Sequence, residues 1–156
     1  MKPLGMNERS LISKRAQRTA DVLQGAHILW VDDHPENNTN ERNILYSFGM
    51  LVDLADSTDK AMSMLKTKKN GRQRYDVIIS DMKRVEKGED KPQAGEELLR
   101  RIKEKAEEFN IIDIPVIFYA GGFDRRRGIP PYAFGMTNRP DDLLHYIMDV
   151  LERQRG

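Results

Sequence analysis

The sequence contains no cysteine, which excludes disulfide bonds, thiol nucleophiles and cysteine-ligated zinc. No apolar run approaches the roughly 20 residues that a membrane span needs, and the N-terminus lacks the apolar core of a signal peptide. An excess of one charge is also missing, because 26 basic and 25 acidic residues leave a net charge of +1. Nothing in the composition therefore indicates membrane or nucleic-acid binding, and we expect a cytoplasmic protein.

Apolar runs and helical patterns alternate along the 156 residues, a length that suits one domain with an appendage. The apolar runs predict strands at 27–31, 50–55, 75–80 and 114–119, with a short fifth strand at 132–136. Helical spacing predicts helices over 7–24 and 36–48, one capped by Ser57 or Thr58, one over 96–109 and one from Pro140 onward. This order predicts an α/β domain over 26–156, a parallel sheet covered on both faces, preceded by a helical extension or linker at 1–25.

Three aspartates follow the ends of two predicted strands. Asp32 and Asp33 come directly after strand 27–31, and Asp81 follows strand 75–80. Ligands of parallel α/β sheets bind beyond the carboxyl ends of the strands, so we expect the three carboxylates to converge there. Two carboxylates about 4 Å apart repel each other by roughly 4 kcal/mol at an effective dielectric constant near 20. Such a cluster needs a cation, a basic partner or raised pKa values, and oxygen ligands favour Mg²⁺. For a single aspartate, exposure to water at a strand end remains the alternative.

Four segments, in this order, resemble the response-regulator receiver domain of the CheY-like superfamily: Ile28–Asp33, Tyr75–Asp81, Ala94–Leu99 and Ile114–Ile117. The resemblance covers residues 26 to 153 and implies a flavodoxin-like, doubly wound, five-stranded parallel sheet. It also implies that Asp81 is the phosphoacceptor and that Asp32 and Asp33 hold Mg²⁺. Lys83 would then offer its backbone carbonyl to the metal.

The same resemblance implies a signalling function in a two-component phosphorelay. Asp81 would accept a phosphoryl group from a phosphohistidine on a sensor histidine kinase or a phosphotransfer protein, and the acyl phosphate would later be lost to water. We expect a downstream protein partner and no enzymatic activity beyond self-phosphorylation from a phosphodonor and autodephosphorylation.

Two positions depart from the receiver pattern in the chemistry of phosphate binding. Ala120 stands where receivers carry a threonine or serine at the end of the fourth strand, and alanine has no hydroxyl donor. Arg139 precedes Pro140 where receivers carry a lysine. Arg139 either contacts phosphate in place of that lysine or forms a surface ion pair with Asp141 or Asp142.

Two loops depart from the pattern as well. The segment 82–93 is longer than in ordinary receivers and highly charged, and it either gates the acidic site, binds a partner or is simply solvated. The segment 121–131 is a poor helix former, which predicts a degenerate fourth helix and a different output surface.

Three functions are compatible with these residues. The first is an atypical receiver that is phosphorylated on Asp81 in a Mg²⁺-dependent reaction, and the second is a pseudo-receiver that binds proteins independently of phosphorylation. The third, a Mg²⁺-dependent phosphohydrolase, ranks last because the Asp-x-Asp arrangement expected after strand 27–31 is missing. The helix at 7–24 would serve as an inter-domain linker or as a dimerisation element of a homodimer.

Overall fold

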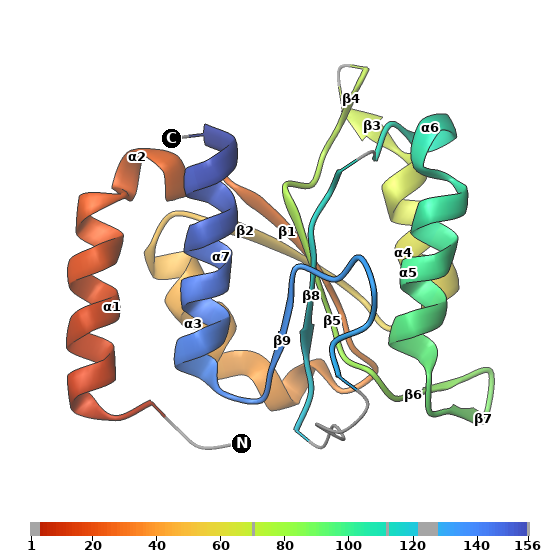
Figure 1. Cartoon of the computed structure of the whole chain (residues 1–156), viewed down its shortest axis with the longest axis horizontal. Coiled ribbons are helices and arrows are strands. Elements are labelled where there is room, and N and C mark those ends of the chain that lie inside the picture. The colour runs from red at the N-terminus through yellow and green to blue at the C-terminus, as the bar shows by residue number, and fades with distance from the viewer. Residues whose placement is uncertain (1–3, 70, 112, 122–127, 156) are drawn as a thin grey trace.

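The computed structural model describes residues 4–69, 71–111, 113–121 and 128–155 (Figure 1). The helices are α1 (Met6–Arg18), α2 (Ala20–Leu23), the 3-10 helix η1 (Pro35–Asn38), α3 (Thr39–Ser47), α4 (Thr58–Lys66), α5 (Ala94–Glu104), α6 (Ala106–Phe109) and α7 (Pro140–Arg155). The strands are β1 (His27–Val31), β2 (Leu51–Ala55), β3 (Lys68–Lys69), β4 (Arg72–Gln73), β5 (Val77–Ser80), β6 (Arg84–Glu86), β7 (Glu89–Lys91), β8 (Val116–Tyr119) and β9 (Gly135–Thr137). Within the described ranges, no helix is both long enough and apolar enough to cross a bilayer.

Four parallel pairings join five strands into one sheet in the order β2-β1-β5-β8-β9. Strand β1 lies between β2 and β5, with Ile28 opposite Val52 on one side and Val77 on the other. Both β1 and β5 are almost entirely apolar because each is covered on both faces. The predicted fold class, a five-stranded, doubly wound parallel sheet, is confirmed.

Alternate residues of the strands face two separate hydrophobic cores. Figure 1 shows the helices on the two sides of the sheet that cover them. Trp30 and Ile79 pack into the core beneath α3 and α7, and Leu29 and Ile78 pack into the core beneath α4 and α5. All four side chains are at most 1% exposed. The central strands therefore form the most deeply buried part of the chain, and the acids that follow them are attached to a rigid base.

The N-terminal extension is helical, as predicted, but it is two helices. The backbone of Thr19 leaves the helical region (φ −114°, ψ 18°), and its hydroxyl donates to the carbonyl of Arg15 at 2.9 Å. Helix α1 packs against α7, where the Arg15 guanidinium contacts Asp149 at 2.6 Å and Glu152 at 3.1 Å. The predicted single helix over 7–24 is wrong at this break.

Two further predicted helices are also divided. The stretch predicted as a helix over 36–48 begins as the 3-10 turn η1 and continues as α3. The helix predicted over 96–109 starts two residues earlier and breaks at Lys105 (φ −103°, ψ 7°) into α5 and α6. Both corrections concern boundaries, because helices cover both faces of the sheet, as predicted.

The fifth strand lies later than predicted. Tyr132 adopts a left-handed conformation (φ 71°), which an extended strand cannot contain, and the turn closes through the amide of Ala133 on the carbonyl of Pro130. Strand β9 therefore begins at Gly135, so the prediction of a strand over 132–136 is only partly correct. Residues 122–127 lie outside the described residues. The prediction of a degenerate fourth helix can therefore be followed only at the ends of that segment, where Gly121 and 128–131 are not helical.

Candidate functional site

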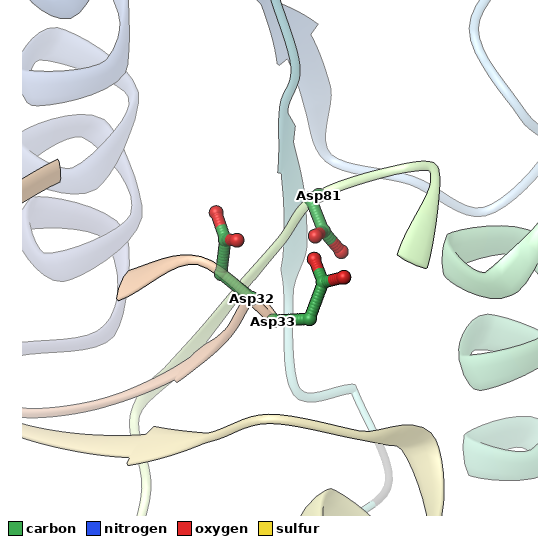
Figure 2. A group of neighbouring side chains, drawn as sticks. All are labelled: Asp32, Asp33 and Asp81. Atoms are coloured by element: carbon green, nitrogen blue, oxygen red, sulfur yellow. The ribbon is translucent and has the colours of Figure 1, made fainter. Parts of the chain in front are cut away.

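The three aspartates are placed by the hydrogen-bond ladder of the central strands. The amide of Asp32 donates to the carbonyl of Ala55 at 2.9 Å, and the amide of Asp81 donates to the carbonyl of Val31 at 3.1 Å. One carboxylate oxygen from each of Asp32, Asp33 and Asp81 lies within 4.8 Å of the other two. Figure 2 shows the carboxylates of Asp33 and Asp81 directed toward one another, with that of Asp32 to the side. The topology thus brings the acids together at the carboxyl edge of the sheet.

Asp32 and Asp33 are both half-buried and accept hydrogen bonds from different segments. The Oδ1 atom of Asp32 accepts from the amide of His34 at 2.8 Å, and its Oδ2 atom accepts from the side chain of Asn38 at 3.3 Å. The Oδ2 atom of Asp33 accepts from the amide of Val85 at 2.9 Å. Val85 belongs to β6, so the inserted segment touches the acidic cluster directly.

Asp81 is paired with a buried arginine from the same inserted segment. Nη1 of Arg84 lies 2.5 Å from Oδ1 of Asp81 and 2.9 Å from the hydroxyl of Ser80, and the Arg84 side chain is 0% exposed. Burial raises the pKa of Asp81 to about 8. The charge of Arg84 opposes this rise, while the charges of Asp32 and Asp33 add to it. The phosphoacceptor candidate therefore has a counter-ion within the protein.

Arg84 uses its remaining donors on α4, on α5 and on Glu86 of its own strand. Nη2 donates to the hydroxyl of Thr58 at 2.7 Å and to the carbonyl of Ala94 at 3.1 Å, and Nε donates to Glu86 at 3.2 Å. This residue was not singled out from the sequence, because the charged residues of 82–93 were considered only together, as a segment that gates the site, binds a partner or is solvated. Lys83, which directly precedes Arg84, has an exposed side chain, and its carbonyl contact with a metal stays a prediction.

The inserted segment is a two-stranded hairpin, β6–β7, anchored beside the acidic site. Lys87 and Gly88 form its turn, both with positive φ (54° and 77°), the pattern of a two-residue hairpin turn. The carboxylate of Glu86 accepts a hydrogen bond from the amide of Thr58 at the start of α4, and Lys87 pairs with Asp59 at 3.1 Å. These contacts attach the hairpin to the start of α4, and Figure 1 shows it beside the N-terminal end of α5.

Ala120 and Arg139 are the two residues whose types depart from the receiver pattern in the sequence. The amide of Ala120 donates to the carbonyl of Thr137 at 3.2 Å, and its side chain offers no donor. The half-exposed guanidinium of Arg139 pairs with Asp141 at 3.2 Å and with Glu8 of α1 at 3.2 Å. Of the two alternatives for Arg139, the structure therefore contains the surface ion pair.

The donor set of the cluster fits a hard divalent cation. All three side chains supply carboxylate oxygens, which Mg²⁺ prefers, usually together with several waters. Val85 engages Oδ2 of Asp33, and Arg84 engages Oδ1 of Asp81. Within the described part of the chain, the other oxygen of each of these two carboxylates has no protein hydrogen-bond partner. One oxygen from each is thus available to a cation.

No family model matches the sequence, and no curated protein matches it. Solved structures do match. The response regulator receiver domain protein of Clostridium thermocellum is 24% identical over 83% of this chain and 97% of its own, with a TM-score of 0.62. A two-component response regulator of Clostridium difficile is 17% identical over 84% of this chain and 99% of its own, with a TM-score of 0.64. The response regulator TrrA of Thermotoga maritima was solved in complex with Mg²⁺ and BeF. It is 20% identical over 80% of this chain and 98% of its own, with a TM-score of 0.60. The chain therefore has the fold of response-regulator receiver domains.

Proposed function

We propose that the chain is an atypical receiver domain that accepts a phosphoryl group on Asp81 in a Mg²⁺-dependent reaction and uses it as a signalling switch. The observation that carries the proposal is the convergence of Asp32, Asp33 and Asp81 within 4.8 Å at the carboxyl edge of a sheet with the receiver fold. A pair of acids beside a third, with one oxygen of Asp81 available, is an arrangement suited to in-line phosphoryl transfer.

The proposed reaction uses the available oxygen of Asp81 as the nucleophile. This Oδ2 atom attacks the phosphorus of a phosphohistidine or of acetyl phosphate, and the bond from phosphorus to the leaving nitrogen or oxygen breaks with its electron pair. Asp32 and Asp33 would hold Mg²⁺ together with Asp81 and the carbonyl of Lys83. The metal would supply charge neutralisation between the anionic donor and the carboxylates. Attack of water on the aspartyl phosphate returns Asp81 and releases inorganic phosphate.

The proposed partners follow from this reaction. A sensor histidine kinase or a phosphotransfer protein would supply the phosphoryl group, and a downstream protein would respond to it. Because Ala120 has no hydroxyl, the response cannot begin with a hydroxyl that moves toward the phosphoryl group from the end of β8. The output of this domain would therefore differ from that of ordinary receivers.

Acetyl phosphate labelling tests the proposal. Purified protein is incubated with acetyl phosphate, with and without MgCl₂, and its intact mass is measured. We expect the mass increase of one phosphoryl group only with MgCl₂, and no increase in Asp81→Asn. Asp76→Asn is the matched control, because Asp76 precedes the same strand at the opposite edge of the sheet and accepts from the His27 amide at 2.9 Å. An unlabelled wild type, or an equally labelled Asp81→Asn, contradicts the proposal.

A pseudo-receiver that binds a protein independently of phosphorylation is the second candidate. Two observations favour it: Ala120 lacks the hydroxyl that would contact the phosphoryl group, and Arg84 already neutralises Asp81. Under this alternative, Asp81→Asn retains wild-type affinity for its partner, as measured by calorimetry. Stoichiometric labelling that changes the affinity would eliminate it.

A further inference from the structure

We propose that Arg84, in place of Arg139, is the cation that positions the Asp81 carboxylate for phosphoryl transfer, an inference that rests on the proposed function. The guanidinium donates to Oδ1 of Asp81 and leaves Oδ2 without a hydrogen-bond partner among the described residues. Figure 2 shows the Asp81 carboxylate directed toward that of Asp33. Arg84 is thus a positioning residue, and the hairpin β6–β7 is the element that supplies it.

The guanidinium is fixed independently of Asp81. Ser80, Thr58, Ala94 and Glu86 together accept four hydrogen bonds from Arg84, at 2.7 to 3.2 Å. Three of these acceptors lie on β5, α4 and α5 and the fourth on β6 itself, so Arg84 keeps its place when Asp81 changes its bonding. A fork fixed by several acceptors holds a carboxylate in one orientation at a small entropic cost, which a flexible lysine cannot do.

Electrostatics give Arg84 a second effect. Three carboxylates repel an incoming phosphoryl donor, which is itself an anion, and a fixed positive charge reduces that repulsion during the reaction. The same charge would also repel Mg²⁺ held by Asp32, Asp33 and the other oxygen of Asp81. Arg84 should therefore weaken metal binding while it accelerates the transfer. Replacing a residue that merely stabilises the fold would not raise the affinity for the metal while lowering the rate of phosphoryl transfer.

Arg139 is held elsewhere. Its guanidinium bridges Asp141 on α7 and Glu8 on α1, and it is 49% exposed. Among the ion pairs of the described residues, the Asp81 carboxylate has one partner, which is Arg84. The inserted hairpin therefore replaces a cation from the end of β9 with one from the loop that follows β5.

Contacts with α4 also hold the hairpin that carries Arg84. Glu86 binds both Nε of Arg84 and the amide of Thr58, so the start of α4 and the guanidinium share one carboxylate. Lys87 closes the tip of the hairpin onto Asp59. Because these contacts lie beyond the acidic cluster, they can hold the hairpin while the available oxygens of Asp33 and Asp81 bind other groups.

Two measurements on the full chain test the proposal: the affinity for Mg²⁺ by isothermal titration calorimetry, and the rate of labelling by acetyl phosphate at saturating MgCl₂. For Arg84→Gln we expect Mg²⁺ to bind about tenfold more tightly, because a nearby positive charge is lost, and labelling to slow at least tenfold. For Arg84→Lys, which keeps the charge, we expect wild-type metal affinity within about threefold and slower labelling than wild type. Circular dichroism establishes that each variant is folded.

Arg139→Ala decides the matter if the Arg84 variants do not fold, because its side chain is exposed. A labelling rate within about twofold of wild type supports the proposal, and a rate at least tenfold slower overturns it. The proposal is also overturned if the wild-type protein is labelled and Arg84→Gln has the same labelling rate and the same affinity for Mg²⁺. That result would leave Asp81 as the phosphoacceptor. An unlabelled wild type contradicts the proposed function itself, so the two failures are distinguishable.

Discussion

Replacing Gly95 with alanine should destabilise the protein, although alanine is the better helix former. Gly95 is the second residue of α5 and lies directly against the acidic site. A Cβ atom at this position would lie 2.5 Å from the carbonyl oxygen of Asp81 and 2.7 Å from the Phe118 ring. The carbonyl cannot rotate away, because it belongs to the backbone that follows β5, and the Phe118 ring is fully buried. The helix must therefore shift.

The magnitude follows from two opposing effects. Overpacking of a well-filled core costs about 1 to 3 kcal/mol, and contact with backbone puts this site at the upper end. The greater helix propensity of alanine returns about 1 kcal/mol at most. We therefore expect Gly95→Ala to lower the free energy of unfolding by about 2 kcal/mol, which is a large part of the stability of a domain of this size.

Urea denaturation followed by the fluorescence of Trp30, the single tryptophan, measures this difference. Glu104→Ala serves as control in the same helix, because it removes one exposed ion pair with Arg100 and should change stability by at most about 0.5 kcal/mol. If Gly95→Ala is as stable as wild type or more stable, helix propensity outweighs packing here, and the reasoning is refuted.

Two further predictions concern ionic contacts away from the acidic site. Arg15→Ala, which removes the bridges from α1 to Asp149 and Glu152, should lower the free energy of unfolding by about 1 kcal/mol in low salt and by less in 1 M NaCl. An equal loss at both salt concentrations, in urea titrations, would exclude an ionic origin. Although burial opposes it, the bond from the Tyr75 hydroxyl holds the pKa of Asp53 below its ordinary value. Asp53 therefore contributes stability above its ordinary pKa, and this contribution is lost as the pH falls through the folded-state pKa. We expect Asp53→Asn to lose less stability than wild type on acidification from about pH 5 to pH 2. Equal losses in pH-dependent urea titrations would count against this role.

The sheet and the acidic cluster could be predicted because both depend on short-range patterns. Strands β1 and β5 are continuous apolar runs, and the aspartates follow them directly, so parallel topology alone implies that the carboxylates meet. The fifth strand was misplaced because Tyr132 adopts a positive φ, which no apolar pattern reveals. Breaks such as that at Thr19 likewise depend on packing against α7.

Arg84 could not be identified from its neighbours in the sequence. The glycine of Lys87-Gly88 suits a tight turn, but the flanking segments 84–86 and 89–91 lack the apolar alternation that would predict the strands β6 and β7. Nothing local distinguishes Arg84 from the other charged residues of 82–93. Its burial depends on acceptors at Thr58 and Ala94, which only the folded chain brings together.

The hydrogen-bond register of the sheet has a consequence for how this domain can change in evolution. Because the amides of Asp32 and Asp81 are bonded within the ladder, the backbone positions of these two acids do not depend on the length or composition of the loop that follows β5. Insertions and deletions in that loop should therefore change the stability of the sheet little. Each insertion brings new side chains to the same carboxylates. The rate of the chemistry and the choice of partner can then diverge among descendants of one fold whose central strands stay the same.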